Sequence, residues 1–498
     1  MNVNPITRLD YPDPDVIRVE DTYYMVSTTM HFMPGCEILQ SFDLVHWEHA
    51  TYVYETLDHT DAQQLKSGQN IYGQGMWAAS LRYHEGRFYI CFVANDTRKT
   101  YLYISEKIDG PWKKQLIEGF YHDGSLLFDE DGRNYIVYGN DEIWITELNE
   151  DLTAPKKDGL HRLLVSDHKN PKLGYEGSHI QKINGYYYIF LVHSLRDRWM
   201  RTEACFYSDS LEGEFTGGDV LCDDRGYCGQ GVAQGGIVDT PDGKWYAMLF
   251  QDSGAVGRIP ILLPVTWKDH FPFFGQNGHV PEEIEVHSTR PGYIYQPLVG
   301  SDDFCNGLLP RWQFNHDPDP RYYHLDALQG TYTITTREVC TELTQAVNTL
   351  TQRMSYPSCA AEVTVDASAL KEGDVAGLCA LQGCYAAVGI TKHHGKYEVL
   401  MLDKKEDGIL DMTEGTVVES HQMDFRLEAD FCNMKDEARC YYRVNKGDWL
   451  PIGTVHKLYF KLDHFTGCRF GLFCYAAEET GGSACFRDFK YYDVDEIS

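Results

Sequence analysis

The stretch Leu9–Thr29, LDYPDPDVIRVEDTYYMVSTT, places one acidic residue, Asp13, between two prolines and directly ahead of an apolar run. Each proline fixes its own φ angle and pushes the residue before it toward an extended conformation, so we expect Tyr11 and Asp13 to be extended. Two short strands rich in Val, Ile and Tyr follow, separated by a Glu-Asp turn, which predicts a β-hairpin. Taken alone, Asp13 is best explained as the punctuation that often begins a strand.

The same hairpin pattern recurs four more times in the first half of the chain. Each copy has a leading residue, a short apolar strand, a polar turn and a second strand rich in Tyr and Phe. Consecutive leading residues are 65, 45, 53 and 58 positions apart, which is typical of four-stranded propeller blades. Five copies predict an all-β fold that begins with a five-bladed β-propeller. The copies are DPDVIRVEDTYYMV from Asp13, AASLRYHEGRFYICF from Ala78, DGSLLFDEDGRNYIVYG from Asp123, EGSHIQKINGYYYIF from Glu176 and QGGIVDTPDGKWYAMLF from Gln234.

The repeat changes the interpretation of Asp13. The first strand of each propeller blade lines the central axis, so the five leading residues should meet at one end of that axis. Asp13, Asp123 and Glu176 would then bring three carboxylates into one funnel, where a purely structural position would carry Ser, Gly or an apolar residue. Like charges held close raise one another's pKa, which suits acid–base chemistry.

Carboxylates with separated pKa values, facing each other across a pocket, are the groups that hydrolyse glycosides. A deprotonated carboxylate activates water, and a protonated one donates its proton to the leaving oxygen. A third acid can orient the donor and keep it protonated. The residues alone leave open whether the reaction retains or inverts the anomeric configuration, because the sequence does not give the carboxyl separation.

Length and charge narrow the class of protein further. A chain of 498 residues is expected to form two or more domains. With 74 acidic and 44 basic residues the formal net charge is −30, which argues against nucleic acid or an anionic membrane as a partner. The 15 cysteines lack a CxxC pair and no secretory signal is visible, so we expect reduced thiols and a cytoplasmic location. The sequence leaves open whether the chain forms a homo-oligomer.

The second half of the chain has a different organisation. The hairpin repeat fades after about residue 297, and the segment RPGYIYQPLVGSDDF has the composition of a linker. Short strands and turns then alternate to the end without helical periodicity, which predicts a jelly-roll-like β-sandwich. We therefore expect a catalytic propeller over residues 1–297 and an accessory sandwich over 298–498. The sandwich could close one side of the pocket, form an oligomer interface or bind carbohydrate.

Several segments of the first 300 residues together resemble family 43 of the glycoside hydrolases, which includes β-xylosidases and α-L-arabinofuranosidases. The resemblance implies a five-bladed propeller that hydrolyses with inversion, with Asp13 as general base, Glu176 as general acid and Asp123 as the residue that tunes and orients the acid. WQFNHDPDPRYYHL resembles the start of the accessory sandwich of some family-43 β-xylosidases, in which a sandwich loop restricts the pocket and favours exo action. The propeller segments that carry the resemblance are YPDPDVIRVEDTYYMVSTT, GMWAASLRYHEGRFYICF, HDGSLLFDEDGRNYIVYG, YEGSHIQKINGYYYIF and GAVGRIPILLPVTW.

The resemblance also suggests residues that bind the substrate. Trp77 and Phe32 look like aromatic walls around the terminal sugar, with packing between blades as the alternative, and Arg258 resembles an arginine that contacts substrate hydroxyls. Gln234 stands where many relatives carry a histidine that helps to hold calcium or a water cluster. Its amide can still hydrogen-bond water or offer its oxygen to calcium. We predict no required metal, with a structural calcium as the alternative.

These observations predict an exo-acting glycoside hydrolase that releases terminal β-D-xylose, α-L-arabinofuranose or both from short xylan- or arabinoxylan-derived oligosaccharides. A mainly arabinofuranosidase activity is one alternative. The alternative from another class is a non-catalytic carbohydrate-binding propeller, although such a protein has no need of a proton donor. A propeller scaffold for protein partners is a third, and it predicts no affinity for sugar.

Overall fold

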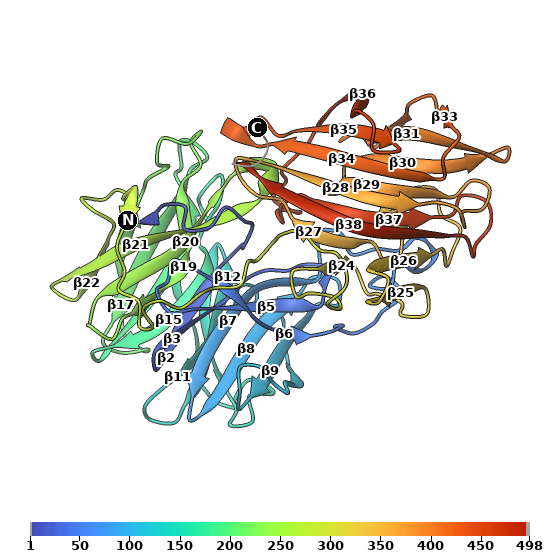
Figure 1. The fold of residues 1–498 in the computed structure, drawn as a ribbon. Coiled ribbons are helices and arrows are strands. Elements are labelled where there is room, and N and C mark those ends of the chain that lie inside the picture. The colour runs from blue at the N-terminus through green and yellow to red at the C-terminus, as the bar shows by residue number, and fades with distance from the viewer. Residues whose placement is uncertain (1, 495–498) are drawn as a thin grey trace.

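The computed structural model describes residues 2–494, so the two outer limits of the predicted domains, Met1 and Ser498, lie outside the described residues. Figure 1 shows two β-rich halves side by side, a propeller from blue to green and a sandwich from yellow to red. Besides strands, the described residues contain four short 3₁₀ helices, which are η1 (Lys66–Gly68), η2 (Gly254–Val256), η3 (Leu343–Gln345) and η4 (Cys432–Met434). The all-β prediction is therefore confirmed.

The first half forms five four-stranded antiparallel sheets, each made of consecutive strands, which confirms the five-bladed propeller. In every blade the first hairpin is the one predicted from the repeat, and the third and fourth strands follow outward. The blades are β2 (Asp15–Val19), β3 (Thr22–Val26), β5 (Gly35–Ser41) and β6 (Glu48–Tyr54); β7 (Met76–His84), β8 (Arg87–Ala94), β9 (Lys99–Ser105) and β10 (Lys113–Ile117); β11 (Ser125–Phe128), β12 (Asn134–Asn140), β13 (Glu142–Leu148) and β14 (His161–Ser166); β15 (Glu176–Ile183), β16 (Tyr186–Ser194), β17 (Arg201–Ser208) and β18 (Thr216–Leu221); and β19 (Val232–Asp239), β20 (Trp245–Asp252), β21 (Arg258–Lys268) and β22 (Phe271–Phe274).

A single arginine joins the inner strands of four blades at the propeller axis. Arg82, on β7, donates from its guanidinium to Asp15 Oδ2 at 2.8 Å, to Ser125 Oγ at 2.7 Å and to the Ile180 carbonyl at 3.2 Å. Asp15 is fully buried, and its other oxygen lies 3.0 Å from Nδ1 of His179 on β15. The axis therefore already contains a fixed positive charge that is balanced by a buried carboxylate.

The second half is a two-sheet sandwich, as predicted, with a core that includes Trp312, Phe314, Phe425 and Phe470. One sheet has the order β32-β31-β30-β29-β37-β27-β24-β4, with β33 beside β31, and the other has the order β25-β26-β38-β28-β34-β35-β36. The strands are β24 (Gln313–Asn315), β25 (Tyr323–Asp326), β26 (Thr331–Thr335), β27 (Leu350–Arg353), β28 (Ser358–Asp366), β29 (Val375–Leu381), β30 (Tyr385–His393), β31 (Lys396–Lys404), β32 (Leu410–Met412), β33 (Thr416–Val418), β34 (Gln422–Asp430), β35 (Glu437–Val444), β36 (Leu450–Lys457), β37 (Arg469–Tyr475) and β38 (Ser483–Asp493).

The two halves share secondary structure. Strand β4 (Phe32–Met33) leaves the first blade and pairs with β24 at the edge of a sandwich sheet. The first and last parts of the propeller half also meet, because β1 (Asn2–Val3) pairs with β23 (Glu283–Ile284). The predicted boundary between residues 297 and 298 lies between β23 and the first sandwich strand, and it stays a prediction.

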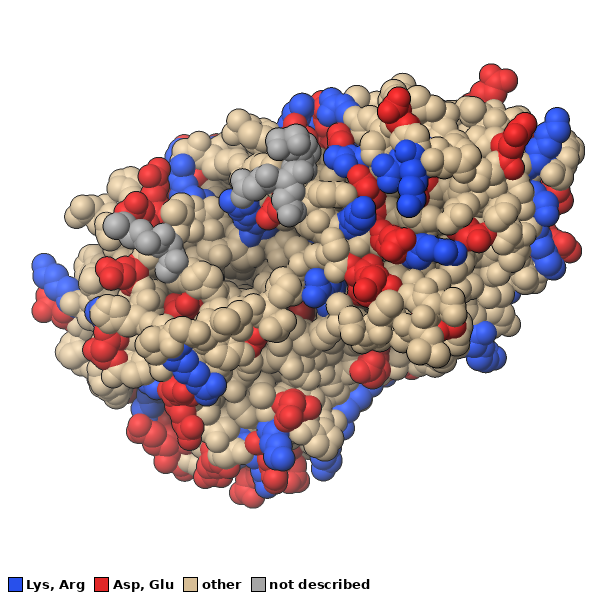
Figure 2. Space-filling model, viewed as in Figure 1, with Lys and Arg blue, Asp and Glu red and all other residues tan. Residues whose placement is uncertain are grey.

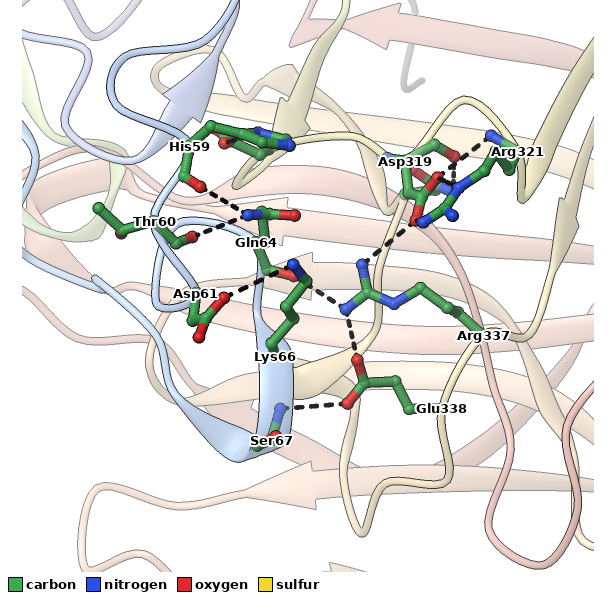
Figure 3. Close-up of polar contacts among 12 residues, drawn as sticks. His59, Thr60, Asp61, Gln64, Lys66, Ser67, Asp319, Arg321, Arg337 and Glu338 are labelled. Atoms are coloured by element: carbon green, nitrogen blue, oxygen red, sulfur yellow. Dashed lines mark hydrogen bonds and ion pairs between the residues drawn. The ribbon is translucent and has the colours of Figure 1, made fainter.

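A polar network fixes the segment between the first two blades against the sandwich (Figure 3). Arg337 Nη2 donates to the Gln64 carbonyl at 2.9 Å, and the Ser67 amide donates to Glu338 Oε2 at 3.1 Å. Arg337 also lies 3.6 Å from Asp319 Oδ2, which is the partner of Arg321. These contacts and the shared strand hold the sandwich in place beside the propeller axis.

The surface carries both signs of charge without a large basic patch on the face that Figure 2 shows. That face is hollowed where the two halves meet. A cavity of about 660 Å³ lies between the two halves and is lined mainly by residues 3–9, 45–47, 295–299 and 355–357. Among the described residues, none of the helices is long and apolar enough to cross a membrane.

Candidate active site

A smaller pocket, of about 210 Å³, collects the predicted acidic residues. Asp13 and Asp123 stand two residues before their inner strands, and Glu176 is the first residue of β15. All three line this pocket together with Gln234 of β19. Ala78, the one remaining leading residue, is not among the lining residues. The structure thus brings together the carboxylates that the repeat pointed to.

The backbone at the strand entrances is unusual, and one expectation is wrong. Asp13 has a φ angle of 52°, in the left-handed region rather than the extended one, and Asp123 and Gln234 have φ angles of 47° and 63°. Residues other than glycine occupy this region at a cost that surrounding contacts must offset. At Asp13 those contacts override the preference imposed by Pro14: Thr28 Oγ1 donates to Oδ2 at 2.5 Å and Arg258 Nη1 donates to Oδ1 at 2.6 Å.

Arg258 reaches the pocket from the start of β21. It is 5% exposed, and its Nε donates to Asp252 Oδ1 at 3.1 Å while its Nη1 holds Asp13. The ring of Phe465 covers the guanidinium at 3.6 Å from its centroid. Arg258 therefore fixes the orientation of the Asp13 carboxylate within the pocket wall.

Glu176 and Asp123 each accept a hydrogen bond from a residue that was not expected from the sequence. Asn140 Nδ2 donates to Glu176 Oε2 at 2.9 Å, and the Gly177 amide donates to Asp123 Oδ2 at 3.1 Å. His122 Nε2 lies between the two carboxylates, 3.5 Å from Asp123 Oδ2 and 3.6 Å from Glu176 Oε2. The sequence feature that could have indicated His122 as a site residue is its position directly before Asp123.

These groups perturb one another's protonation. Burial raises the pKa of Asp123 to about 6, with Glu176 and Asp13 adding to the rise and His122 opposing it. Burial lowers the pKa of His122, but Asp123 and Glu176 outweigh burial and raise it to about 9. Burial also acts to raise the pKa of Glu176, yet the neighbouring His122 holds it below its ordinary value. His122 Nε2 lies 3.6 Å from Glu176 Oε2, so the protonation of each of these three groups depends on the other two, and together they form an acid–base unit.

The aromatic wall of the pocket differs from the predicted one. Trp77 lines the pocket as expected, and its partner is Phe465 of the sandwich, with ring centroids 5.0 Å apart in an edge-on arrangement. Phe32 is not brought to the pocket: its strand β4 joins the sandwich sheet, and the Arg469 guanidinium covers its ring at 3.5 Å. Leu462 also lines the pocket, so a sandwich loop closes one side of it.

Asp10 fastens that loop to the site. Its Oδ1 accepts the amide of Arg258 at 2.7 Å and its Oδ2 accepts the amide of Gly467 at 2.8 Å. The carboxylate is 2% exposed, and burial raises its pKa to about 6. Asp10 thus connects the backbone of the pocket arginine to the loop that carries Phe465.

Two places could be considered for a metal ion. His122, Asp123 and Glu176 offer one ligand atom each within 4.8 Å of one another, but these are the residues of the acid–base unit. At the axis, the Arg82 guanidinium occupies the centre of the inner strands and would repel a cation there. Arg82 therefore disfavours a calcium ion beside Asp15 and Ser125.

The combination of a propeller, a pocket closed on one side and three carboxylates within it defines a glycoside hydrolase. Residues 3–272 match the family model described as glycosyl hydrolases family 43, and residues 301–492 match the beta xylosidase C-terminal concanavalin A-like domain. The chain belongs to glycoside hydrolase family 43, and the resemblance seen in its sequence is confirmed.

Individual relatives agree with this assignment. A beta-xylosidase of Formosa agariphila is 26% identical over 554 residues, covering 99% of this chain and 89% of that protein. The structure of a bifunctional GH43-CE protein of Bacteroides eggerthii is 41% identical with a TM-score of 0.92; the match covers 100% of this chain, which spans 64% of that protein. A second structure, 27% identical with a TM-score of 0.87 over 99% of both chains, is a GH43 enzyme engineered to display both endo-xylanase and exo-arabinofuranosidase activity.

Proposed function

We propose that this enzyme releases terminal pentoses, β-D-xylose and/or α-L-arabinofuranose, from short xylan- or arabinoxylan-derived oligosaccharides by single displacement with inversion. The observation that carries the proposal is the pocket itself. It has a volume of about 210 Å³, contains the three carboxylates and is closed on one side by Leu462 and Phe465 of the sandwich. A small, one-ended pocket admits the end of a sugar chain and excludes its middle.

The contacts of each acid support the step that we assign to it. The Asp13 carboxylate, held by Thr28 and Arg258, takes a proton from the water that attacks the anomeric carbon. Glu176 takes a proton from its neighbours His122 and Asp123 and gives it to the glycosidic oxygen as the bond to the anomeric carbon breaks. Asp123 orients the acid through the Gly177 amide, and with His122 it forms the unit that supplies the proton. The products are the free pentose and the shortened alcohol.

A second candidate is an enzyme that acts mainly as an α-L-arabinofuranosidase. The engineered structural relative displays exo-arabinofuranosidase activity, whereas the Formosa relative is a beta-xylosidase. Xylopyranose and arabinofuranose can present similarly placed hydroxyls, so one pocket can serve both. We prefer the xylosidase because the sandwich half matches the domain model described as the beta xylosidase C-terminal domain.

We further propose that hydrolysis requires no metal. The support is Arg82, which fills the axis with a protein cation paired to the buried Asp15. The cytoplasmic location and a homo-oligomeric state stay predictions.

The test is a side-by-side assay of kcat/KM on 4-nitrophenyl β-D-xylopyranoside and 4-nitrophenyl α-L-arabinofuranoside, with and without EDTA. We expect turnover of at least one, faster for the xyloside, and no change with the chelator. Turnover of neither substrate would contradict the pentosidase proposal, and loss of activity in EDTA would contradict the metal-free one.

A further inference from the structure

Arg201 begins β17 and lines the same pocket as the three carboxylates, although nothing in its sequence context marks it. The residue is 2% exposed, and its Nε donates to Asp252 Oδ2 at 2.9 Å. Its Nη1 is buried and has no hydrogen-bond partner among residues 2–494. Leaving a buried, charged donor without a partner costs free energy, so such an atom indicates a place where a ligand or water completes the site.

The position of Arg201 is fixed by the same carboxylate that fixes Arg258. Asp252 accepts Arg258 Nε with Oδ1 and Arg201 Nε with Oδ2. Arg258 then directs its Nη1 to Asp13. The Arg201 guanidinium packs near the rings of Trp199 and Phe250, at 5.4 and 5.3 Å from their centroids. Arg201 is therefore a preorganised donor.

We propose that Arg201 Nη1 donates a hydrogen bond to one hydroxyl of the terminal sugar and is a specificity-determining residue. The inference rests on the proposed function, because it assumes that a sugar occupies this pocket. A guanidinium only donates, so it requires an acceptor such as a hydroxyl oxygen. The charges of Arg201 and Arg258 are balanced by Asp252 and Asp13, which favours a neutral hydroxyl over an anionic sugar group.

The test is a double-change cycle, in which the substitution Arg201→Met in the enzyme is combined with removal of single hydroxyls from the substrate. kcat/KM is measured for the 4-nitrophenyl glycoside that the wild type hydrolyses fastest, and for its monodeoxy derivatives. We expect Arg201→Met to lower kcat/KM on the parent glycoside about 10- to 100-fold, the size of one charged hydrogen bond. On the derivative that lacks the contacted hydroxyl, the variant and the wild type should have equal kcat/KM, whereas the other derivatives should show the full loss.

Arg225→Met is the matched control. Arg225 lies between β18 and β19, is partly buried and donates to Gln251 Oε1 at 3.1 Å, but it is not among the residues that line the pocket. Its removal should change kcat/KM by the same factor on every derivative. Arg201→Lys keeps the charge without the planar fork and replaces the Met variant in the cycle if that variant does not fold.

One outcome contradicts the proposal: the Arg201 variant changes kcat/KM by the same factor on the parent and on every deoxy derivative. If the pentose assignment is wrong, the wild-type rates themselves show it, because the wild type then hydrolyses the other parent glycoside faster. The cycle around Arg201 is then run on that other glycoside.

Discussion

Glu176→Gln is expected to lower kcat/KM on xylo-oligosaccharides by roughly 10²–10⁴-fold, the usual contribution of a positioned acid. The amide keeps the shape of the side chain and can still meet Asn140, but it has no proton to give to the leaving oxygen. An aryl xyloside whose phenol is a good leaving group needs little proton donation, so its rate should fall much less. Steady-state kinetics on xylobiose and on 2,4-dinitrophenyl β-D-xylopyranoside would measure this difference.

The control for this variant is Glu212→Gln, which makes the same chemical change at an exposed site of the same blade. It should leave both rates unchanged. Inhibition by xylose should also be similar in the wild type and in Glu176→Gln, because binding of the sugar does not need the proton. Equal losses on both substrates would show that Glu176 is not the acid.

Asp13→Asn is expected to lower kcat/KM by a similar factor of roughly 10²–10⁴, but on good and poor leaving groups alike. Water must lose a proton as it attacks the anomeric carbon, and an amide cannot accept that proton. The amide oxygen can still accept the hydrogen bond of Arg258, and the amide nitrogen can donate to the Thr28 hydroxyl, so the pocket should keep its shape. The measurement is kcat/KM across a series of aryl xylosides together with the melting temperature.

Asp21→Asn is the matched control for the base, because Asp21 lies in the turn of the same hairpin and pairs with Arg290 at the surface. It should retain full activity. A variant Asp13→Asn that hydrolyses the dinitrophenyl substrate at the wild-type rate would exclude Asp13 as the base.

Much of the propeller could be predicted from the sequence because hairpins are local. A strand, a Gly- or Asp-containing turn and a second strand leave a pattern in about 15 residues, and five copies of it located Asp13, Asp123 and Glu176. The convergence of these residues then followed from the symmetry of the fold. The backbone angle of Asp13 did not follow, because contacts with Thr28 and Arg258 override the local effect of Pro14.

The parts of the site that come from elsewhere in the chain left no such pattern. Phe465 lies in a sandwich loop and reaches the pocket only because the two halves pack together. Phe32 lies beside the first blade in sequence, yet its strand joins the sandwich sheet and removes it from the pocket. Arg201 is held in the pocket by the buried Asp252, which lies 51 residues further along the chain. The sequence does not reveal that the two residues meet.

The central claim is that Asp13 and Glu176 act on opposite sides of one sugar in a single displacement. Proton NMR of the first sugar released from an aryl β-D-xyloside, recorded before mutarotation, tests it most directly. The account predicts that α-xylose appears first and that the β anomer follows only by mutarotation. Initial release of β-xylose would contradict the account, because it would require a covalent intermediate on one of the carboxylates.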